Sequence, residues 1–230
     1  GASRGLGKAV ARRFAREGAR LVICSRHATE VEEVALEIRR AGGEVIALKA
    51  DVSSERDVDR LVATTLKISG RIDVLVNNAG VLTPKAKLHE IRVTDWDQTI
   101  AVNLRGPFLC LRGVLPPMLA QRHGSIINVS SGAGKREAPF WGAYAVSKFG
   151  IEGLTLVAAG ETRASDVVRV NAVNPGGTRT TMRAMAYPDE DPTTIPAPDD
   201  ITGVFLYLAS EASRDLTGQS NEAPDWLPEH

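Results

Sequence analysis

Residues 1–7 read Gly1-Ala2-Ser3-Arg4-Gly5-Leu6-Gly7, and they lead directly into an amphipathic segment. Leu6, Val10 and Phe14 recur there at intervals of four residues, which is the spacing of one helix face. Glycine permits a tight turn and close approach to the backbone, and a helix N-terminus offers unpaired N–H groups with partial positive charge. The stretch therefore predicts a phosphate-binding turn before a helix, and a plain glycine loop is the alternative.

Short runs rich in valine and isoleucine follow, at residues 21–24, 44–48, 72–76, 125–129 and 167–173. Apolar strands that alternate with amphipathic segments are typical of a parallel sheet covered by helices on both faces. The pattern predicts one α/β domain over residues 1–230, with a three-layer doubly wound Rossmann fold. No strand precedes the glycine turn, although that strand is central in a dinucleotide-binding fold. We therefore expect the first strand to be absent from this sequence and present in the natural protein.

Two helix starts are predicted from capping boxes. Ser54 is followed three residues later by Asp57, and Thr94 is followed by Asp97. A hydroxyl at the first position of such a box accepts a hydrogen bond from the backbone N–H three residues on. We therefore expect helices to begin directly after Ser54 and Thr94.

The composition argues against several classes of function. The 230 residues carry 28 Lys and Arg against 28 Asp and Glu, so charge gives no case for a nucleic-acid or membrane partner. No apolar run reaches the length of a membrane span, and the opening residues lead us to expect no signal segment. Cys24 and Cys110 are far apart and the four histidines are dispersed, which predicts no metal site and a cytoplasmic location.

Tyr144 and Lys148 lie four residues apart at the start of a predicted helix, so they share one face. A free tyrosine has a pKa of about 10, and a neighbouring ammonium group lowers the pKa toward the range useful for acid–base catalysis. The spacing alone is weak evidence, because it also occurs on helices where both residues only pack.

Polar residues follow two predicted strands at their carboxyl ends, where open α/β sheets bind ligands. Ser130 and Ser131 follow one strand, and the sequence Asn77-Asn78-Ala79-Gly80 follows another. Asn78 is expected to brace its turn. At the end of the run 21–24, Ser25 and Arg26 stand where a carboxylate often holds the adenosine ribose. With Arg4, Arg26 favours the 2′-phosphate of NADP(H) over NAD(H), and the alternative is two solvated surface charges.

The order of these motifs resembles the short-chain dehydrogenase/reductase family. It runs from G-x-x-x-G-x-G through N-N-A-G, Asn103 on a helix, the serine pair and Y-x-x-x-K to Asn174-Pro175-Gly176, and covers nearly the whole chain. The sequence is most similar to bacterial reductases that carry N-P-G-G-T-R-T before a short lid, and more distantly to 3-oxoacyl-acyl-carrier-protein reductases. The resemblance implies an NADPH-dependent enzyme that reversibly reduces a ketone or 3-oxoacyl carbonyl to an alcohol.

The resemblance also implies roles for individual residues. Tyr144 would give the carbonyl oxygen its proton, Ser131 would stabilise that oxygen, and Lys148 would lower the Tyr144 pKa and hold the nicotinamide ribose. Asn103 would hold a water that links Lys148 to solvent. The implied cofactor contacts are Gly1, Ser3, Arg4, Gly5, Leu6, Gly7, Ser25, Arg26, Asp51, Val52, Asn77, Ala79, Gly80, Tyr144, Lys148, Pro175, Gly176, Thr178 and Thr180. For the two threonines, turn capping is the alternative.

Two segments depart from the family pattern. Residues 181–198 hold four prolines, which predicts a short lid, and the polar residues 220–225 predict a short or missing last strand. A homodimer or homotetramer is implied, with the tetramer less secure. Candidate pocket walls are Leu82, Lys85, Gly132, Ala133, Phe140, Trp141, Met182 and Met185. Lys135, Arg136 and Arg183 are either solvated or add positive charge for an anionic acyl carrier or carboxylate substrate.

Two other functions stay open at this point. An NAD-linked alcohol or sugar dehydrogenase would use the same residues, but it fits Ser25 and Arg26 less well. A non-catalytic dinucleotide-binding sensor would be expected to lack Tyr144 or Lys148, and both are present.

Overall fold

The computed structural model describes residues 1–163 and 167–226, so the last four residues of the predicted domain lie outside it. Its strands are β1 Leu21–Ser25, β2 Val45–Lys49, β3 Val74–Asn77, β4 Gly124–Val129, β5 Val168–Asn174 and β6 Ser220–Glu222. The α-helices are α1 Gly5–Arg16, α2 Ala28–Arg40, α3 Glu55–Ser69, α4 Val93–Ile100, α5 Gly106–Ala120, α6 Gly142–Arg163, α7 Thr181–Ala186 and α8 Gly203–Ala209. Each predicted apolar run therefore overlaps a strand.

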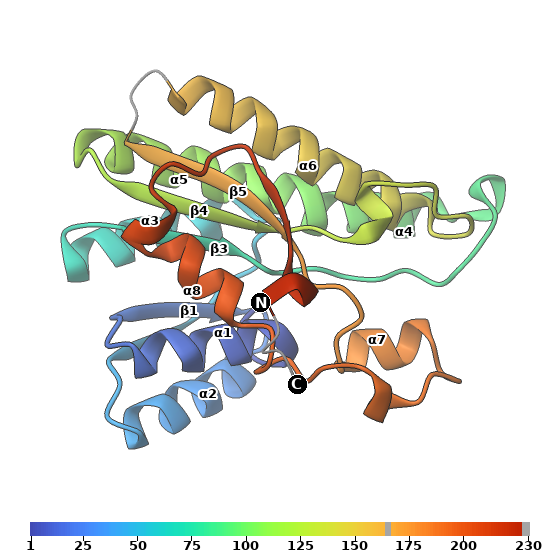
Figure 1. The fold of residues 1–230 in the computed structure, drawn as a ribbon, viewed down its shortest axis with the longest axis horizontal. Coiled ribbons are helices and arrows are strands. Elements are labelled where there is room, and N and C mark those ends of the chain that lie inside the picture. Colours follow the sequence, from blue (N-terminus) through green and yellow to red (C-terminus); the bar gives the residue numbers. More distant parts are fainter. Residues whose placement is uncertain (164–166, 227–230) are drawn as a thin grey trace.

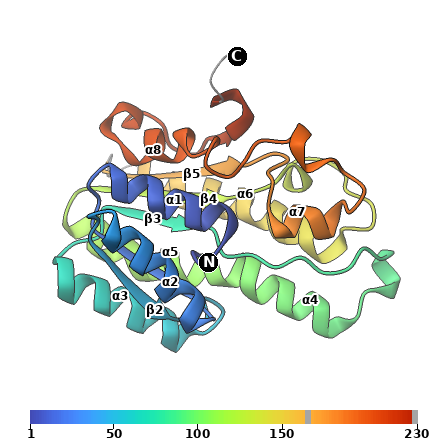
Figure 2. The same cartoon turned by 90° about the horizontal axis from the view of Figure 1, so that it is seen from below.

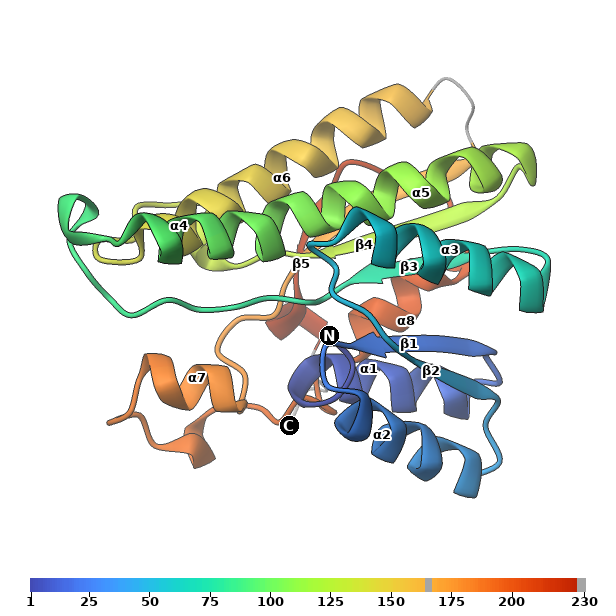
Figure 3. The same cartoon turned by 180° about the vertical axis from the view of Figure 1, so that it is seen from behind.

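Helices cover both faces of the strands (Figure 1). The helices α3, α5 and α6 lie on one face, and α1, α2 and α8 lie on the other, as the views from below and behind also show (Figures 2 and 3). All pairings between neighbouring strands are parallel. The predicted three-layer α/β fold is confirmed.

Neighbouring residues of β4 face opposite layers. Ile126 packs among residues of α5 and α6, including Met118, while Ile127 packs with α1 and α8, including Phe205. All four of these side chains are fully buried. A strand buried on both faces reads as a continuous apolar run, which is why the sequence located it so clearly.

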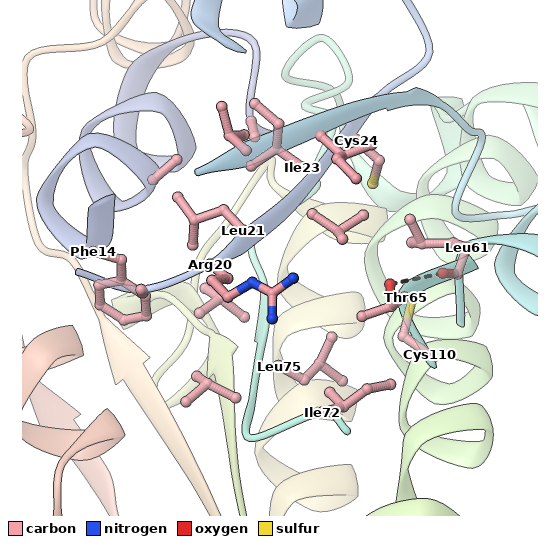
Figure 4. A pocket seen from close by; sticks show the side chains of 18 of the residues that line it. Phe14, Arg20, Leu21, Ile23, Cys24, Leu61, Thr65, Ile72, Leu75 and Cys110 are labelled. Atoms are coloured by element: carbon pink, nitrogen blue, oxygen red, sulfur yellow. Dashed lines mark hydrogen bonds between the residues drawn. The ribbon is translucent and has the colours of Figure 1, made fainter. Parts of the chain in front are cut away.

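The sheet is interrupted between β1 and β3. The described strands pair in the orders β1-β2 and β3-β4-β5-β6, and none of them joins β1 to β3. A cavity of about 590 Å³ separates the two parts, lined by apolar side chains of both strands and of α5 (Figure 4). Leu21, Ile23, Leu75 and Cys110 lie around it. No described strand occupies the position at which the sequence predicted a missing strand. That a segment outside this sequence fills the cavity stays a prediction.

The two predicted capping boxes have different outcomes. The Ser54 hydroxyl accepts a hydrogen bond from the Asp57 amide at 3.3 Å and caps α3, as predicted. The prediction for Thr94 was wrong, because α4 begins at Val93, two residues earlier than predicted, and Arg92 precedes it without a side-chain cap. Arg92 instead forms a bidentate ion pair with Asp95 at 2.7 and 2.8 Å across the first turn.

The last strand is short, as the polar C-terminal sequence predicted. β6 has three residues, and it pairs with the carboxyl half of β5. Its side chains also make contacts: Glu222 accepts a hydrogen bond from Asn174 at 2.6 Å and forms an ion pair with Lys135. The strand is therefore tied to the polar turns that follow β4 and β5.

Candidate active site

A second cavity, of about 460 Å³, opens at the carboxyl ends of β1, β3, β4 and β5. Eighteen of the predicted site residues line it. They are Gly1, Ser3, Arg4, Gly5, Leu6, Ser25, Arg26, Asp51, Val52, Ala79, Gly80, Ser131, Tyr144, Lys148, Pro175, Gly176, Thr178 and Thr180. The parallel topology brings these residues together, because it places the carboxyl ends of all the strands at one edge.

Gly7 lies so close to Gly1 and Asn78 that a side chain at this position would not fit. A Cβ atom on Gly7 would lie 2.1 Å from the Gly1 carbonyl oxygen and 2.5 Å from the Asn78 side-chain nitrogen. Asn78 donates a hydrogen bond to that same carbonyl at 2.8 Å. Gly7 therefore permits packing below the turn and does not line the cavity, whereas Asn78 braces the turn and also lines the cavity.

The end of β1 supplies a hydroxyl and a guanidinium group. The Ser25 hydroxyl lies 3.3 Å from the Ser3 hydroxyl, which ties the glycine turn to β1. Arg26 is exposed at the cavity rim. Burial acts to raise the pKa of Asp51, but two hydrogen bonds from Ser53 and the nearby Arg26 guanidinium outweigh burial and lower the pKa. Asp51 is therefore ionised at neutral pH.

Tyr144 and Lys148 lie together on the cavity wall. The Lys148 ammonium nitrogen is 5.6 Å from the centroid of the Tyr144 ring, and it donates a hydrogen bond to the Val129 carbonyl oxygen at 2.7 Å. The Lys148 side chain is buried, and burial lowers its pKa to about 8, with the carboxylate of Glu152 acting in the opposite direction. Near pH 8, the buried amine is therefore divided between its charged and neutral forms.

The pKa of Tyr144 moves opposite to the sequence-based prediction. Burial of its hydroxyl raises the pKa, a hydrogen bond with Ser131 acts to lower it, and nearby Tyr187 acts to raise it. The desolvation of the phenolate outweighs the favourable contacts that the protein itself supplies. Without other groups in the cavity, the phenol is thus protonated across the neutral range, in the form that donates a proton.

Ser131 lies at the junction of β4 and the short helical turn Gly132–Gly134. Its hydroxyl accepts a hydrogen bond from the Ala133 amide at 3.3 Å and also interacts with Tyr144. The Ser131 hydroxyl and the Tyr144 phenol therefore lie within hydrogen-bond distance of each other on the cavity wall. Both are hydroxyl groups that are able to donate to a carbonyl oxygen.

Asn103 and Asn77 do not line the cavity. Asn103 lies in a π-helical turn, Ala101–Arg105, and its amide bonds both backbone groups of Val81, at 2.8 and 2.9 Å, and the Ser147 hydroxyl at 3.2 Å. The Asn77 side chain points into the sheet and donates to Asn128 on β4 at 2.9 Å. Both amides brace the elements that carry the cavity residues.

The two threonines after the Asn174 turn have capping contacts. Thr178 donates to the Pro175 carbonyl oxygen at 3.0 Å, and Thr180 accepts from the Arg183 amide at 3.1 Å as the N-cap of α7. Gly176 has φ of 67° and lies against Pro224, whose ring carbon would be 2.8 Å from an added Cβ. The turn therefore requires glycine for both its conformation and its packing.

The segment 181–198 folds over the cavity through α7. Met182, Arg183, Met185 and Tyr187 line the cavity from this side, with Leu82 and Trp141 opposite them, whereas the other four candidate wall residues lie outside. The Tyr187 and Trp141 rings are 5.9 Å apart, and the Lys85 ammonium lies 4.6 and 4.9 Å from their centroids. Sequence reasoning missed Tyr187, although it lies only two residues from the predicted wall residue Met185.

Two of the three candidate mouth cations are already paired. Arg183 forms a bidentate ion pair with Glu190 at 2.6 and 2.5 Å, and Lys135 pairs with Glu222. Of these three cations, only Arg183 lines the cavity. Two of the three cations that the sequence predicted for an anionic substrate are thus neutralised by carboxylates among the described residues.

Two further structural findings bear on function. Within residues 1–163 and 167–226, no helix is both long and apolar enough to cross a membrane. The same residues contain no group of three or more His, Cys, Asp or Glu side chains arranged to hold a metal ion.

Comparisons with known proteins agree with this geometry. A family model described as short chain dehydrogenase matches residues 1–191. A 3-oxoacyl-[acyl-carrier-protein] reductase from Synechocystis sp. is 40% identical over 227 residues, which cover 96% of this chain and 91% of the relative.

Solved structures match at the level of the whole chain. A chain described as a short chain dehydrogenase from Shigella flexneri 2a, complexed with NADP, has a TM-score of 0.90 and 33% identity, covering 97% of this chain and 94% of that one. Another from Escherichia coli CFT073, complexed with NADPH, has a TM-score of 0.90 and 34% identity, covering 97% and 93%.

Proposed function

The chain belongs to the short-chain dehydrogenase/reductase family of oxidoreductases, and from this premise we propose that it reversibly reduces a carbonyl group to an alcohol with NADPH. One observation carries the proposal: a single cavity is lined both by Arg4 and Arg26 and by Ser131, Tyr144 and Lys148. The two arginines lie at the glycine turn and after β1, and the other three residues lie after β4 and on α6. The 40% identity to a 3-oxoacyl-[acyl-carrier-protein] reductase supports a ketone or 3-oxoacyl substrate.

The residues present fit a nicotinamide dinucleotide. Gly1 and Gly5 line the cavity at the glycine turn, and together with the positive end of α1 they suit a diphosphate there. Ala79, Gly80 and Asp51 lie at the next strand ends, where the adenosine portion would be held. Lys148, Pro175 and Gly176 would hold the nicotinamide end, and this group when bound supplies the hydride that the reduction needs.

Tyr144 acts as the general acid in this proposal. Its phenol gives a proton to the carbonyl oxygen while the carbonyl carbon is reduced, and the Ser131 hydroxyl donates a hydrogen bond to the same oxygen. The Lys148 ammonium stabilises the phenolate that remains. Asn103 acts indirectly, by holding the Val81 backbone and the Ser147 hydroxyl in place, and a water relay at Asn103 stays a prediction.

The rate should depend on pH through Lys148. Burial lowers the pKa of this amine to about 8, so the stabilising ammonium is present below that pH and is lost above it. Because the pKa of Tyr144 is raised, the phenol keeps its proton over the same range. We expect log(kcat/KM) for reduction to be level below about pH 8 and to fall by about one unit per pH unit above it. Initial rates of NADPH oxidation check this, and a level profile to about pH 10 contradicts it.

We further propose that NADPH is preferred over NADH because Arg26, with Arg4, holds the 2′-phosphate. Arg26→Ala removes a charge-assisted hydrogen-bond donor from the cavity rim. We expect the Kd for NADPH to rise about 10- to 100-fold while the Kd for NADH changes by less than about threefold. Fluorescence titration of both cofactors measures this, with exposed Arg40→Ala on α2 as the matched control. An equal rise in the Kd for NADPH and for NADH would contradict the proposal that Arg26 holds the 2′-phosphate.

The overall proposal is tested by NADPH consumption with a panel of ketones, diketones, quinones and 3-oxoacyl thioesters. A second form of the chain, extended before Gly1 by a short apolar strand, is assayed in parallel because an open cavity of 590 Å³ costs stability. Turnover with NADPH supports the proposal. Turnover that occurs only with NAD+ and an alcohol or sugar would favour an NAD-linked dehydrogenase. Tight NADPH binding without turnover by folded protein would favour a sensor.

We also propose that the chain forms a homodimer or homotetramer. Phe108 on α5 and Phe149, Leu156 and Val157 on α6 are large apolar side chains with 45–60% of their surface exposed. Such side chains on neighbouring helices support a contact with a second copy.

A further inference from the structure

Helix α6 presents a third polar side chain in line with the two that the proposed reaction uses. Tyr144, Lys148 and Glu152 are spaced by four residues, so they follow one another on one face of the helix. The reaction described above assigns no role to Glu152. Its position one turn beyond a buried lysine nevertheless places a carboxylate on the side of Lys148 away from Tyr144.

Two hydrogen bonds hold the Glu152 carboxylate in place, near enough to Lys148 to act on it. One of its oxygens accepts hydrogen bonds from Ser130, at the end of β4, and from Ser220 on β6, the latter at 2.9 Å. Ser130 follows Val129, whose carbonyl oxygen accepts from Lys148. The carboxylate and the ammonium are therefore held by adjacent residues of the same strand end, and Ser131 comes next.

Other charged groups near α6 are engaged elsewhere. On the neighbouring elements, Lys135 pairs with Glu222 and Asp95 pairs with Arg92, while Arg105 and Arg169 donate to backbone carbonyl groups. Asp97 on α4 is exposed to solvent, and Tyr187 on the lid side faces Tyr144. Among the described residues, Glu152 is the one charged side chain with a resolved effect on Lys148.

We propose that Glu152 is a positioning residue, which keeps the buried Lys148 in its ammonium form and holds the Ser130–Ser131 turn against α6. The effect of Glu152 on catalysis rests on the proposed function, whereas its effect on the charge of Lys148 does not. Burial alone favours the neutral amine, and a fixed carboxylate nearby offsets part of that cost. Ser130 and Ser220 supply the hydrogen bonds that a partly buried carboxylate requires.

The test is Glu152→Gln, which keeps an oxygen acceptor for both serines and removes the charge. We expect the titration midpoint of Lys148, followed by NMR of the 13C-labelled lysine in ligand-free protein, to fall by about one pH unit. Lys148→Met assigns the signal. Glu161→Gln removes an exposed carboxylate from the same helix and should leave the midpoint unchanged. Glu152→Met, also uncharged and of similar length, is the second variant should Glu152→Gln not fold.

The pH profile of kcat/KM separates this proposal from the function. We expect the alkaline limb of Glu152→Gln to move to lower pH by the same amount as the lysine midpoint. An unchanged midpoint in both Glu152 variants overturns the proposal, whatever the activity. A midpoint that moves while the limb does not supports the role of Glu152 and overturns the catalytic role given to Lys148.

Discussion

Tyr144→Phe is expected to lower kcat for carbonyl reduction by about 10²- to 10⁴-fold, the range typical of a lost general acid. The ring is retained, so its packing beside Trp141, at 6.1 Å between centroids, should persist. The Kd for NADPH should change by less than about threefold, because the lost hydroxyl acts on the substrate oxygen. Steady-state kinetics and cofactor titration on the same preparation measure both quantities.

The matched control for this variant is Tyr207→Phe. Tyr207 lies on α8, stacks on Trp226 at 4.6 Å between ring centroids, and does not line the cavity. It should keep kcat within about threefold of the wild type. A Tyr144→Phe protein that is folded, binds NADPH and retains a kcat within about threefold would contradict the assignment of the general acid.

Ser131→Ala is expected to lower kcat by about 10²- to 10³-fold, as found when one donor to a developing oxyanion is removed. Its hydroxyl interacts with Tyr144, and its contact with the Ala133 amide is long at 3.3 Å. The loss should therefore arise in the reaction more than in the stability of the turn. Single-turnover kinetics at saturating NADPH isolate the chemical step.

Ser131→Thr provides the comparison for this effect, since it restores a hydroxyl at the same position. We expect it to recover at least about tenfold of the rate that Ser131→Ala loses. Equal rates for the alanine and threonine variants would show that the hydroxyl does not take part.

The fold, and which residues lie together in the candidate site, were predictable because both follow from the order of the apolar strands along the sequence. Buried parallel strands such as 125–129 are continuous apolar runs, which the sequence makes visible. The carboxyl ends of parallel strands lie at one edge of the sheet, so Ser131 and Gly80 were expected to line the same cavity, and they do. The gap between β1 and β3 was predictable from the same pattern, because the expected strands include none that would lie between them. The first residue of a helix was harder to predict. Because Arg92 forms an ion pair with Asp95, α4 begins at Val93 and Thr94 is not its cap.

Side-chain pairing and burial in the folded chain could not be predicted from the sequence. Lys135 forms an ion pair with Glu222, 87 residues away, and Arg183 forms one with Glu190 of the lid segment. The three cations predicted near the cavity mouth therefore suggested more positive charge there than the folded chain has. The sheet register places Asn77 opposite Asn128, which turns its amide away from the cavity. The pKa of Tyr144 depends on burial, which spacing within one helix does not reveal.

Transfer of a labelled hydride tests the central claim most directly. NADPH that carries deuterium at both C4 positions is incubated with the protein and the compound from the panel that is consumed fastest. The product is then analysed by NMR. We predict deuterium on the carbinol carbon of the alcohol, and a rate at least about 10²-fold lower with Tyr144→Phe. Folded protein that binds the labelled NADPH but places no deuterium on any carbonyl carbon of the panel would contradict the account.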